Sequence, residues 1–259
     1  MAKKIIETLT ELFSLEGRVG IVTGGSSGIG LAITSLLADA GAKIYAVSDR
    51  ICEAKDESYS ANKNIIHILL DITSKSEVKK LITEIGNKES LDFLVNNAGI
   101  TYKGKAEKFD LDQWDFIHKV NVDAVFYLSQ FAYPYLKESK FIGRIVNISS
   151  MAAHLGFSEV VPYCSTKAAV LGITRGLAVE WVNDNILVNS VAPGWFPSKM
   201  TQQVMDEERK KKILNRMPLH RFGETKDIGA MVLFLLSNGA KYITGQDFAV
   251  DGGTLSYGY

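Results

Sequence analysis

The chain has 259 residues, of which 46% are hydrophobic and 22% charged, a globular composition with enough apolar material for one large core. Its 29 basic residues balance its 29 acidic ones, so a nucleic acid or another polyanion is not an expected partner. The two cysteines, Cys52 and Cys164, favour a reducing cytoplasm over a disulfide framework. No apolar run is long enough to cross a bilayer and the first residues lack a signal-peptide core, so we expect a cytoplasmic protein without a membrane partner.

Residues 1–14 predict a short amphipathic helix appended to a single domain that runs from 15 to 259. Within that domain, Val/Ile/Leu-rich stretches alternate with helical patterns. Strands that are apolar throughout are buried on both faces, and such alternation is typical of an α/β fold with a doubly wound parallel sheet and helices on both faces. The predicted strands lie at 18–24, 43–48, 64–70, 91–99, 143–150, 186–194 and 247–253, and the predicted helices at about 30–40, 74–85, 110–136, 162–182 and 227–237.

The stretch TGGSSGIG, residues 23–30, lies between the first predicted strand and the first predicted helix of the domain. Glycines there let the backbone approach a pyrophosphate, which then meets the amides and the positive dipole of the helix N-terminus. A glycine-rich turn can be only a turn, but its place between a strand and a helix favours a dinucleotide site. The candidate cofactor contacts in it are Gly24, Ser26, Ser27, Gly28, Ile29 and Gly30.

The residues that follow the second and third predicted strands address the kind of dinucleotide. Asp49 is placed to accept hydrogen bonds from the ribose hydroxyls of NAD and would repel the 2′-phosphate of NADP. Arg50 would instead grip that phosphate, but the glycine turn carries no basic residue, so the sequence favours NAD over NADP. Asp71 and Ile72 are candidates for contact with the adenine edge, and a helix-capping role for Asp71 is the alternative.

Tyr163 and Lys167, in YCSTK, share one face of the predicted helix 162–182. An ammonium group on the same face as a phenol can manage the proton of that phenol. The spacing alone does not identify such a site, because it occurs two more times in the chain. The other two pairs are Tyr59/Lys63 and Tyr133/Lys137.

Six short motifs, in this order and over residues from about 15 to 252, resemble the short-chain dehydrogenase/reductase family. They are TGGSSGIG, NNAG at 96–99, Asn121 in KVNVDAVF, NISS at 147–150, YCSTK, and PG at 193–194. The resemblance implies a Rossmann-type fold. It also implies an oxidoreductase that transfers a hydride between a nicotinamide dinucleotide and a secondary alcohol or ketone.

The resemblance distinguishes the three tyrosine–lysine pairs. In this family the active-site serine lies thirteen positions before the tyrosine, and Ser150 holds that place relative to Tyr163. Ala46 and Val120 hold it relative to the other two tyrosines. The neighbouring Ser149 is off by one position, and its side chain should point to the other side of the strand.

The family's catalytic roles then fall on Asn121, Ser150, Tyr163 and Lys167. Tyr163 would exchange a proton with the substrate oxygen, and Ser150 would donate a hydrogen bond to that oxygen. Free tyrosine titrates near ~10, so Lys167 and the positive nicotinamide ring would have to lower the pKa of the phenol by about 3 units, or about 4 kcal/mol. Lys167 would also hold the nicotinamide ribose, and Asn121 a water that links Lys167 to solvent.

The resemblance implies further contacts with the cofactor and with the substrate. We expect the segment at about 195–218 to cover the substrate site as a lid. The four histidines have no metal-like spacing, so we expect no metal site. The implied cofactor contacts are Asn97, Ala98, Gly99, Tyr163, Lys167, Pro193, Gly194 and Ser198, and the implied substrate contacts are Ser150, His154, Tyr163 and Trp195.

The end of the chain is similar to the sugar-acid members of the family, the ketogluconate and deoxygluconate dehydrogenases, in TQQ, DEER and AVDGG. A sugar acid or polyol is therefore the expected small-molecule substrate, and a 3-oxoacyl thioester or steroid ketone is the alternative. An inactive NAD-binding regulatory protein is a third hypothesis, although it would not need all four catalytic residues. The resemblance further implies a homotetramer, joined through the helices at 110–136 and 162–182 and the C-terminal strand.

Overall fold

The computed structural model describes residues 2–52, 62–197 and 206–257 and contains one seven-stranded parallel sheet. The strands are arranged in the order β3-β2-β1-β4-β5-β6-β7, and every neighbouring pair is parallel. The four central strands are buried along their whole length, which explains why they read as uninterrupted apolar runs. The strand bounds are β1 Val19–Thr23, β2 Lys43–Ser48, β3 Ile65–Leu69, β4 Phe93–Asn96, β5 Gly143–Ile148, β6 Ile186–Pro193 and β7 Asp247–Val250.

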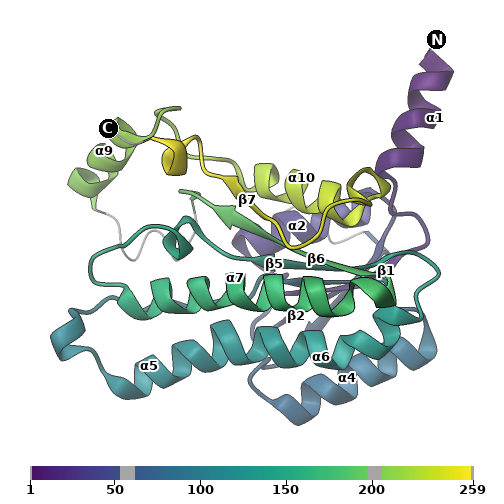
Figure 1. Cartoon of the computed structure of the whole chain (residues 1–259), viewed down its shortest axis with the longest axis horizontal. Coiled ribbons are helices and arrows are strands. Elements are labelled where there is room, and N and C mark those ends of the chain that lie inside the picture. The colour runs from purple at the N-terminus through teal and green to yellow at the C-terminus, as the bar shows by residue number, and fades with distance from the viewer. Residues whose placement is uncertain (1, 53–61, 198–205, 258–259) are drawn as a thin grey trace.

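Helices cover both faces of the sheet (Figure 1). One face carries α2 and α10, which pack against each other, and the other carries α4, α6 and α7. Each helical layer has its own apolar core against the sheet, so the predicted doubly wound α/β fold is confirmed. The helix bounds are α1 Ala2–Phe13, α2 Gly28–Asp39, α4 Lys75–Lys88, α5 Leu111–His118, α6 Ala124–Lys137, α7 Val161–Trp181, α9 Glu207–Arg216 and α10 Thr225–Leu236.

The strand order places a switch point between β1 and β4. The chain builds outward from β1 through β2 to β3, and then crosses back to β4 on the other side of β1. The connections that follow β1 and β4 therefore leave in opposite directions, and ligands of open α/β sheets bind in the crevice this creates at the carboxyl ends of the strands. The glycine turn follows β1 and the NNAG motif follows β4, so both predicted cofactor segments lie at this crevice.

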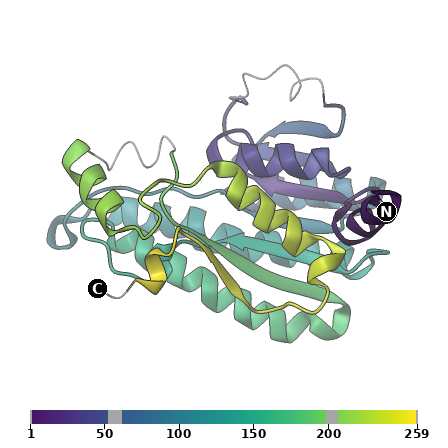
Figure 2. The ribbon, with the colours of Figure 1, turned by 90° about the horizontal axis from the view of Figure 1, so that it is seen from above.

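The N-terminal helix α1 projects from the body, at the opposite end of the molecule from α9 (Figures 1 and 2). Its last residues contact α10, through the rings of Phe13 and Phe234, and the segment after α10, where the Asn238 side chain donates to the Glu11 carbonyl. Ile6 and Leu9, on its apolar face, are more than half exposed. Among the described helices we find none that would reach across a bilayer.

Candidate active site

The glycine turn after β1 leaves room for a ligand backbone. Gly24 and Gly28 have φ values of +64° and +52°, in the left-handed region that favours glycine. A Cβ at Gly30 would come within 2.0 Å of the Gly24 carbonyl oxygen, so the turn closes tightly only with glycine there. Ser27 caps α2 without a side-chain hydrogen bond, which leaves the first amides of that helix to an anion. These features fit the pyrophosphate of a dinucleotide.

We expect Gly30→Ala to weaken dinucleotide binding by at least about tenfold, or about 1.4 kcal/mol. The added methyl group would push the Gly24 carbonyl and the Asn97 side chain outward, because both lie closer than van der Waals contact allows. Titration of the purified protein with reduced dinucleotide, followed by cofactor fluorescence, measures the affinity. Gly172→Ala in α7 is the control, since a Cβ there meets no atom within 4 Å. Equal affinity of the two variants would contradict the expectation.

Asn97 and Ala98 tie the end of β4 to the glycine turn. The backbone amides of both residues donate to the Thr23 hydroxyl, at 3.0 and 3.1 Å, and the Asn97 side chain donates to the Thr23 carbonyl at 2.9 Å. Gly99 follows, where a Cβ would lie 3.3 Å from Asn121 Oδ1 and 3.5 Å from Lys167 Nζ. Residues 97–99, which follow β4, thus form a strip that connects the glycine turn with the predicted catalytic residues.

The end of β2 carries the two residues that bear on the choice of dinucleotide. Asp49 and Arg50 form an exposed, two-point ion pair, with Nε to Oδ1 at 2.9 Å and Nη2 to Oδ2 at 3.3 Å. The guanidinium hydrogen bonds lower the pKa of the Asp49 carboxyl. Ser26 is buried in the turn, where its hydroxyl accepts from that of Ser48 at 2.7 Å. A ribose diol and a 2′-phosphate would therefore compete for opposite halves of one ion pair.

Asp71 and Ile72 make local contacts at the start of the connection to α4. The Asp71 carboxylate accepts from the backbone amide and the hydroxyl of Thr73, at 2.8 and 2.9 Å, so it stabilises the turn before that helix. Ile72 is buried, and its carbonyl accepts from the Tyr127 hydroxyl. The alternative role for Asp71, capping of a helix, is not what the structure shows, because the N-cap of α4 is Ser74 and Asp71 stabilises the turn before it.

Ser150, Tyr163 and Lys167 come together beyond the carboxyl end of β5. Ser150 follows β5 in extended conformation, and its side chain lies close enough to the Tyr163 phenol to lower the pKa of that phenol. Lys167, which is 4% exposed, lies one helical turn after Tyr163, with Nζ 5.6 Å from the centre of the tyrosine ring. Its ammonium donates to the Ile148 carbonyl at 2.7 Å, which anchors α7 to the end of β5.

Burial dominates the titration of both groups on α7. Burial raises the pKa of the Tyr163 phenol, and the hydrogen bond from Ser150 works in the opposite direction. Burial lowers the pKa of Lys167 to about 8. Lys167 is not among the groups that shift the pKa of Tyr163, and desolvation has the largest effect. That Lys167 and the positive nicotinamide ring together lower this pKa stays a prediction.

Asn121 lies in a five-residue π-helical segment, Lys119–Asp123, between α5 and α6. Its side chain holds Ile100, donating to the carbonyl at 2.9 Å and accepting from the amide at 2.9 Å, and it also donates to the Thr166 hydroxyl at 3.1 Å. Both amide hydrogens of Asn121 are thus used. A water held by Asn121 must therefore bind its side-chain or main-chain carbonyl oxygen. Single π-helical turns of this kind are frequent at functional sites.

The rival serine, Ser149, has a structural role. Its hydroxyl lies 2.7 Å from Asp247 Oδ1 and 3.0 Å from the Val191 carbonyl, toward β6 and β7. Ser149 and Ser150 therefore have different side-chain partners, Asp247 and Val191 for the first and the Ala152 amide for the second. Asp247 was not predicted from the sequence, since its partners lie almost a hundred residues away along the chain.

The predicted substrate contacts line the same end of the sheet. The His154 ring bonds to Asp247, with Nε2 and Oδ2 2.7 Å apart, so one of its nitrogens is already used. Trp195 is half-buried against Phe157, with ring centres 6.0 Å apart, and follows Pro193 and Gly194 at the end of β6. Ser198 and part of the predicted lid, 198–205, lie outside the described residues, whereas α9 forms the later part of that segment.

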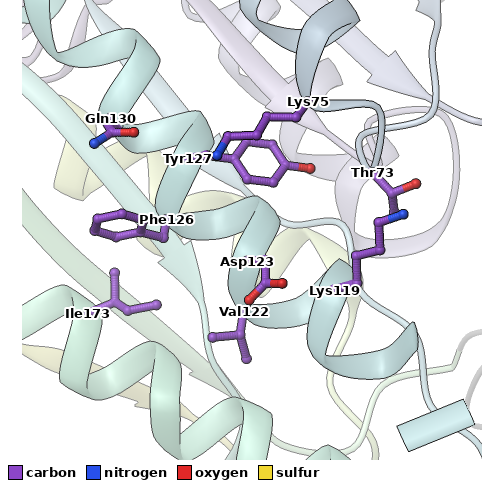
Figure 3. Close-up of a pocket in the computed structure, with 9 residues that line it drawn as sticks. All are labelled: Thr73, Lys75, Lys119, Val122, Asp123, Phe126, Tyr127, Gln130 and Ile173. Carbon is purple, nitrogen blue, oxygen red and sulfur yellow. The ribbon is translucent and has the colours of Figure 1, made fainter. Parts of the chain in front are cut away.

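A cavity of about 490 Å³ lies elsewhere, over α6 and the π-helical segment (Figure 3). Lys75 and Tyr127 line one side, and Phe126 and Ile173 line the other. The cavity contains none of the predicted site residues. It is therefore separate from the candidate active site, where Ser150, Tyr163 and Lys167 converge.

Comparison with known proteins supports the resemblance to the short-chain dehydrogenase/reductase family. Residues 24–254 match a family model described as enoyl-(acyl carrier protein) reductase. The 2-dehydro-3-deoxy-D-gluconate 5-dehydrogenase of Bacillus subtilis is 36% identical over 96% of this chain and 98% of its own. A 3-oxoacyl-(acyl-carrier-protein) reductase of Thermotoga maritima is 35% identical over 92% of this chain and 98% of its own.

A solved structure agrees in fold as well as in sequence. The gluconate 5-dehydrogenase of Burkholderia cenocepacia, in complex with NADP and tartrate, superposes with a TM-score of 0.86. It is 30% identical, and the match covers 95% of this chain and 98% of that one. The sheet order, the glycine turn and the match along nearly the whole chain agree with one another, and the chain belongs to the short-chain dehydrogenase/reductase family.

Proposed function

We propose that the protein is an oxidoreductase that transfers a hydride between a nicotinamide dinucleotide and a secondary alcohol or ketone of a sugar acid or polyol. The observation that carries the proposal is the convergence of Ser150, Tyr163 and Lys167 beside Gly99, at the end of the strip that begins in the glycine turn. A dinucleotide laid along this strip would have its pyrophosphate at α2 and its other end at Tyr163.

The dinucleotide, when bound, supplies the hydride donor or acceptor, and the protein supplies the geometry and the proton. The Tyr163 hydroxyl gives a proton to the substrate oxygen during reduction and takes it during oxidation. The Ser150 hydroxyl hydrogen-bonds that oxygen and holds it in reach. Lys167, with a pKa of about 8, exists in both protonation states near neutral pH, so it can pass a proton toward Asn121 and solvent.

The substrate class rests on the relatives. Two of the three described above act, by name, on gluconate or a deoxygluconate, and the third acts on a 3-oxoacyl carrier protein. A 3-oxoacyl thioester or a steroid ketone is therefore the second candidate substrate, and of these two only the thioester has a counterpart among the relatives described above. An inactive NAD-binding regulator remains the third hypothesis. The half-buried Trp195 and the pairing of His154 with Asp247 favour a polar substrate at a site with both ring and hydrogen-bonding groups.

The test is turnover by the purified protein. We expect the absorbance of the reduced nicotinamide to change with NAD or NADP and a member of a panel of sugar acids and polyols. Acyl thioesters and steroid ketones form the second arm of that panel, and exclusive turnover there would support the alternative. Binding of the dinucleotide without turnover of any member would overturn the proposal in favour of a regulator.

The choice of dinucleotide is a separate proposal. The sequence preference for NAD rests on Asp49, and the comparisons do not support that preference, since the Burkholderia relative has NADP bound. We propose that the Asp49–Arg50 pair decides the choice, with NAD preferred.

Exchanging each member of this pair for a neutral residue should shift cofactor use in opposite directions. Asp49→Asn removes the repulsion of a 2′-phosphate and should raise the ratio of NADP to NAD in kcat/KM by about tenfold, or about 1.4 kcal/mol. Arg50→Gln removes the guanidinium that would bind that phosphate and should lower the ratio by a similar factor. Steady-state kinetics with each dinucleotide measure both ratios. A shift in the same direction for both variants would contradict this role of the pair.

We also propose a homotetramer in the cytoplasm. Several apolar side chains on α5, α6 and α7 are exposed, among them Leu111 at 76%, Phe126 at 47% and Val179 at 78%. Phe126 also lines the cavity over α6, which a second subunit would cover. Cys52 and Cys164 do not form a disulfide, which suits a reducing compartment. Light scattering after gel filtration gives the mass in solution, and a monomer would overturn this part of the proposal.

A further inference from the structure

Asp247 is a largely covered carboxylate that receives three side-chain hydrogen bonds. It begins β7, opposite Ser190 of β6 in the register of the sheet, and its side chain is 10% exposed. Oδ1 accepts from the hydroxyls of Ser149 and Ser190, at 2.7 and 2.6 Å, and Oδ2 is bound by His154 Nε2 at 2.7 Å. A carboxylate with this many donors is held in one orientation.

The partners of Asp247 lie on both sides of Ser150. Ser149 immediately precedes Ser150 at the end of β5. His154 ends the short 3₁₀ turn Met151–Ala153, which Ser150 begins by accepting from the Ala152 amide at 3.1 Å. Asp247 therefore fixes the chain just before and just after Ser150, from a strand that contributes nothing else to the predicted catalytic set.

We propose that Asp247 is a positioning residue that holds the Ser150 hydroxyl toward Tyr163, an inference that rests on the proposed function. Ser150 has to place one hydrogen bond on a substrate oxygen that Tyr163 also reaches. Displacing a reacting group by about 1 Å costs on the order of 100-fold in rate. The backbone at Ser150 is extended, and the segments before and after it are each tied to Asp247, through Ser149 and His154. Loss of the carboxylate removes both of these side-chain ties at once, although Ser149 keeps its hydrogen bonds to the Val191 carbonyl.

Asp92 provides a matched control. It is a fully buried carboxylate that likewise has three donors, the Val19 amide and the hydroxyls of Ser90 and Ser139. It precedes β4 at the amino ends of the strands, whereas Ser150 lies at their carboxyl ends. Replacing either aspartate by asparagine turns one acceptor into a donor that faces existing donors, so both variants should have a lower Tm.

The experiment compares Asp247→Asn with Asp92→Asn in kcat, dinucleotide affinity, and hydrogen exchange of the peptide that covers 149–155. We expect kcat to fall on the order of 10- to 100-fold in Asp247→Asn only, with dinucleotide affinity unchanged. Exchange of 149–155 should become faster in the same variant and not in the control. Ser190→Ala, compared with Ser90→Ala, is the milder pair if Asp247→Asn does not fold. It should show the same pattern with a smaller factor.

Equal losses of kcat in the Asp247 and Asp92 variants at the same folded fraction would overturn the inference. Faster exchange without a loss of kcat would also overturn it, since the segment would then be anchored without consequence for Ser150. The exchange measurement needs no substrate. Failure of the wild-type protein to turn over any substrate would thus count against the proposed function, while unchanged exchange in Asp247→Asn would count against the anchor itself.

Discussion

Tyr163→Phe should reduce kcat by about a thousandfold or more, the upper part of the range for a general acid–base. The substitution removes only the hydroxyl that exchanges a proton with the substrate oxygen. The ring stays in place beside Lys167, so dinucleotide affinity should change by less than about tenfold, which corresponds to one hydrogen bond. Steady-state turnover and a fluorescence titration with the reduced dinucleotide separate the two effects.

Tyr133→Phe is the control that the chain itself offers. Tyr133 has the same spacing to Lys137 that Tyr163 has to Lys167, but its hydroxyl donates to Asp184 at 2.7 Å near the far end of α7. Its loss should leave kcat unchanged. A comparable fall in both variants would mean that the phenol acts through stability, and unchanged turnover in Tyr163→Phe would remove the tyrosine from the mechanism.

The parts of the fold that could be predicted from the sequence are those set by local patterns. Continuous apolar runs mark β1, β4, β5 and β6 because both faces of these strands are covered. The glycine turn is visible because a strand, a sharp turn and a helix follow one another within a few residues. The convergence of Ser150, Tyr163 and Lys167 follows from a fixed spacing on one strand and one helix, and that spacing was supplied by family resemblance.

The other parts of the site depend on contacts between distant segments. The π-helical segment at Asn121 has the same apolar periodicity as an α-helix over so few residues, and its amide partner Ile100 lies on another connection. Asp247 reads as an ordinary residue at the start of an edge strand, and only the folded sheet brings Ser149 and His154 to it. The direction of the Tyr163 pKa shift likewise depends on burial, which has no signature in YCSTK.

Lys167 should make the protein less stable at neutral pH than a neutral residue of similar size would. Its folded-state pKa, about 8, lies below the ordinary value of 10.5. Well below pH 8 the amine is mostly charged in the folded and the unfolded state, and the folded state bears the cost of burying that charge. As pH rises from 8 to 10.5 the folded state releases its proton first, so the free energy of unfolding should rise by about 3 kcal/mol over that window.

Lys167→Met tests this expectation, because the variant should gain stability while it loses activity. The variant should lose turnover, because no amine remains beside Tyr163. Its free energy of unfolding at pH 7 should nevertheless exceed that of the wild type by about 2 kcal/mol, since about 1 kcal/mol is lost with the hydrogen bond to Ile148. Urea unfolding of the dinucleotide-free proteins at pH 7 and at pH 10 measures both quantities, and the advantage of the variant should disappear at the higher pH.

Lys137→Met is the control for the effect of Lys167→Met on stability, because Lys137 has the same spacing to Tyr133 that Lys167 has to Tyr163. Lys137 is 45% exposed and paired with Asp184 at 2.8 Å, and that pairing raises its pKa instead of lowering it. Its replacement should therefore not stabilise the protein at pH 7.

If the unfolding free energies of the wild type and Lys167→Met ran parallel between pH 7 and pH 10, the buried amine would not titrate in this range, and the proton route through Lys167 would lose its physical basis. A stable, inactive Lys167→Met would show that the chain tolerates a costly buried cation because the reaction at Tyr163 requires one.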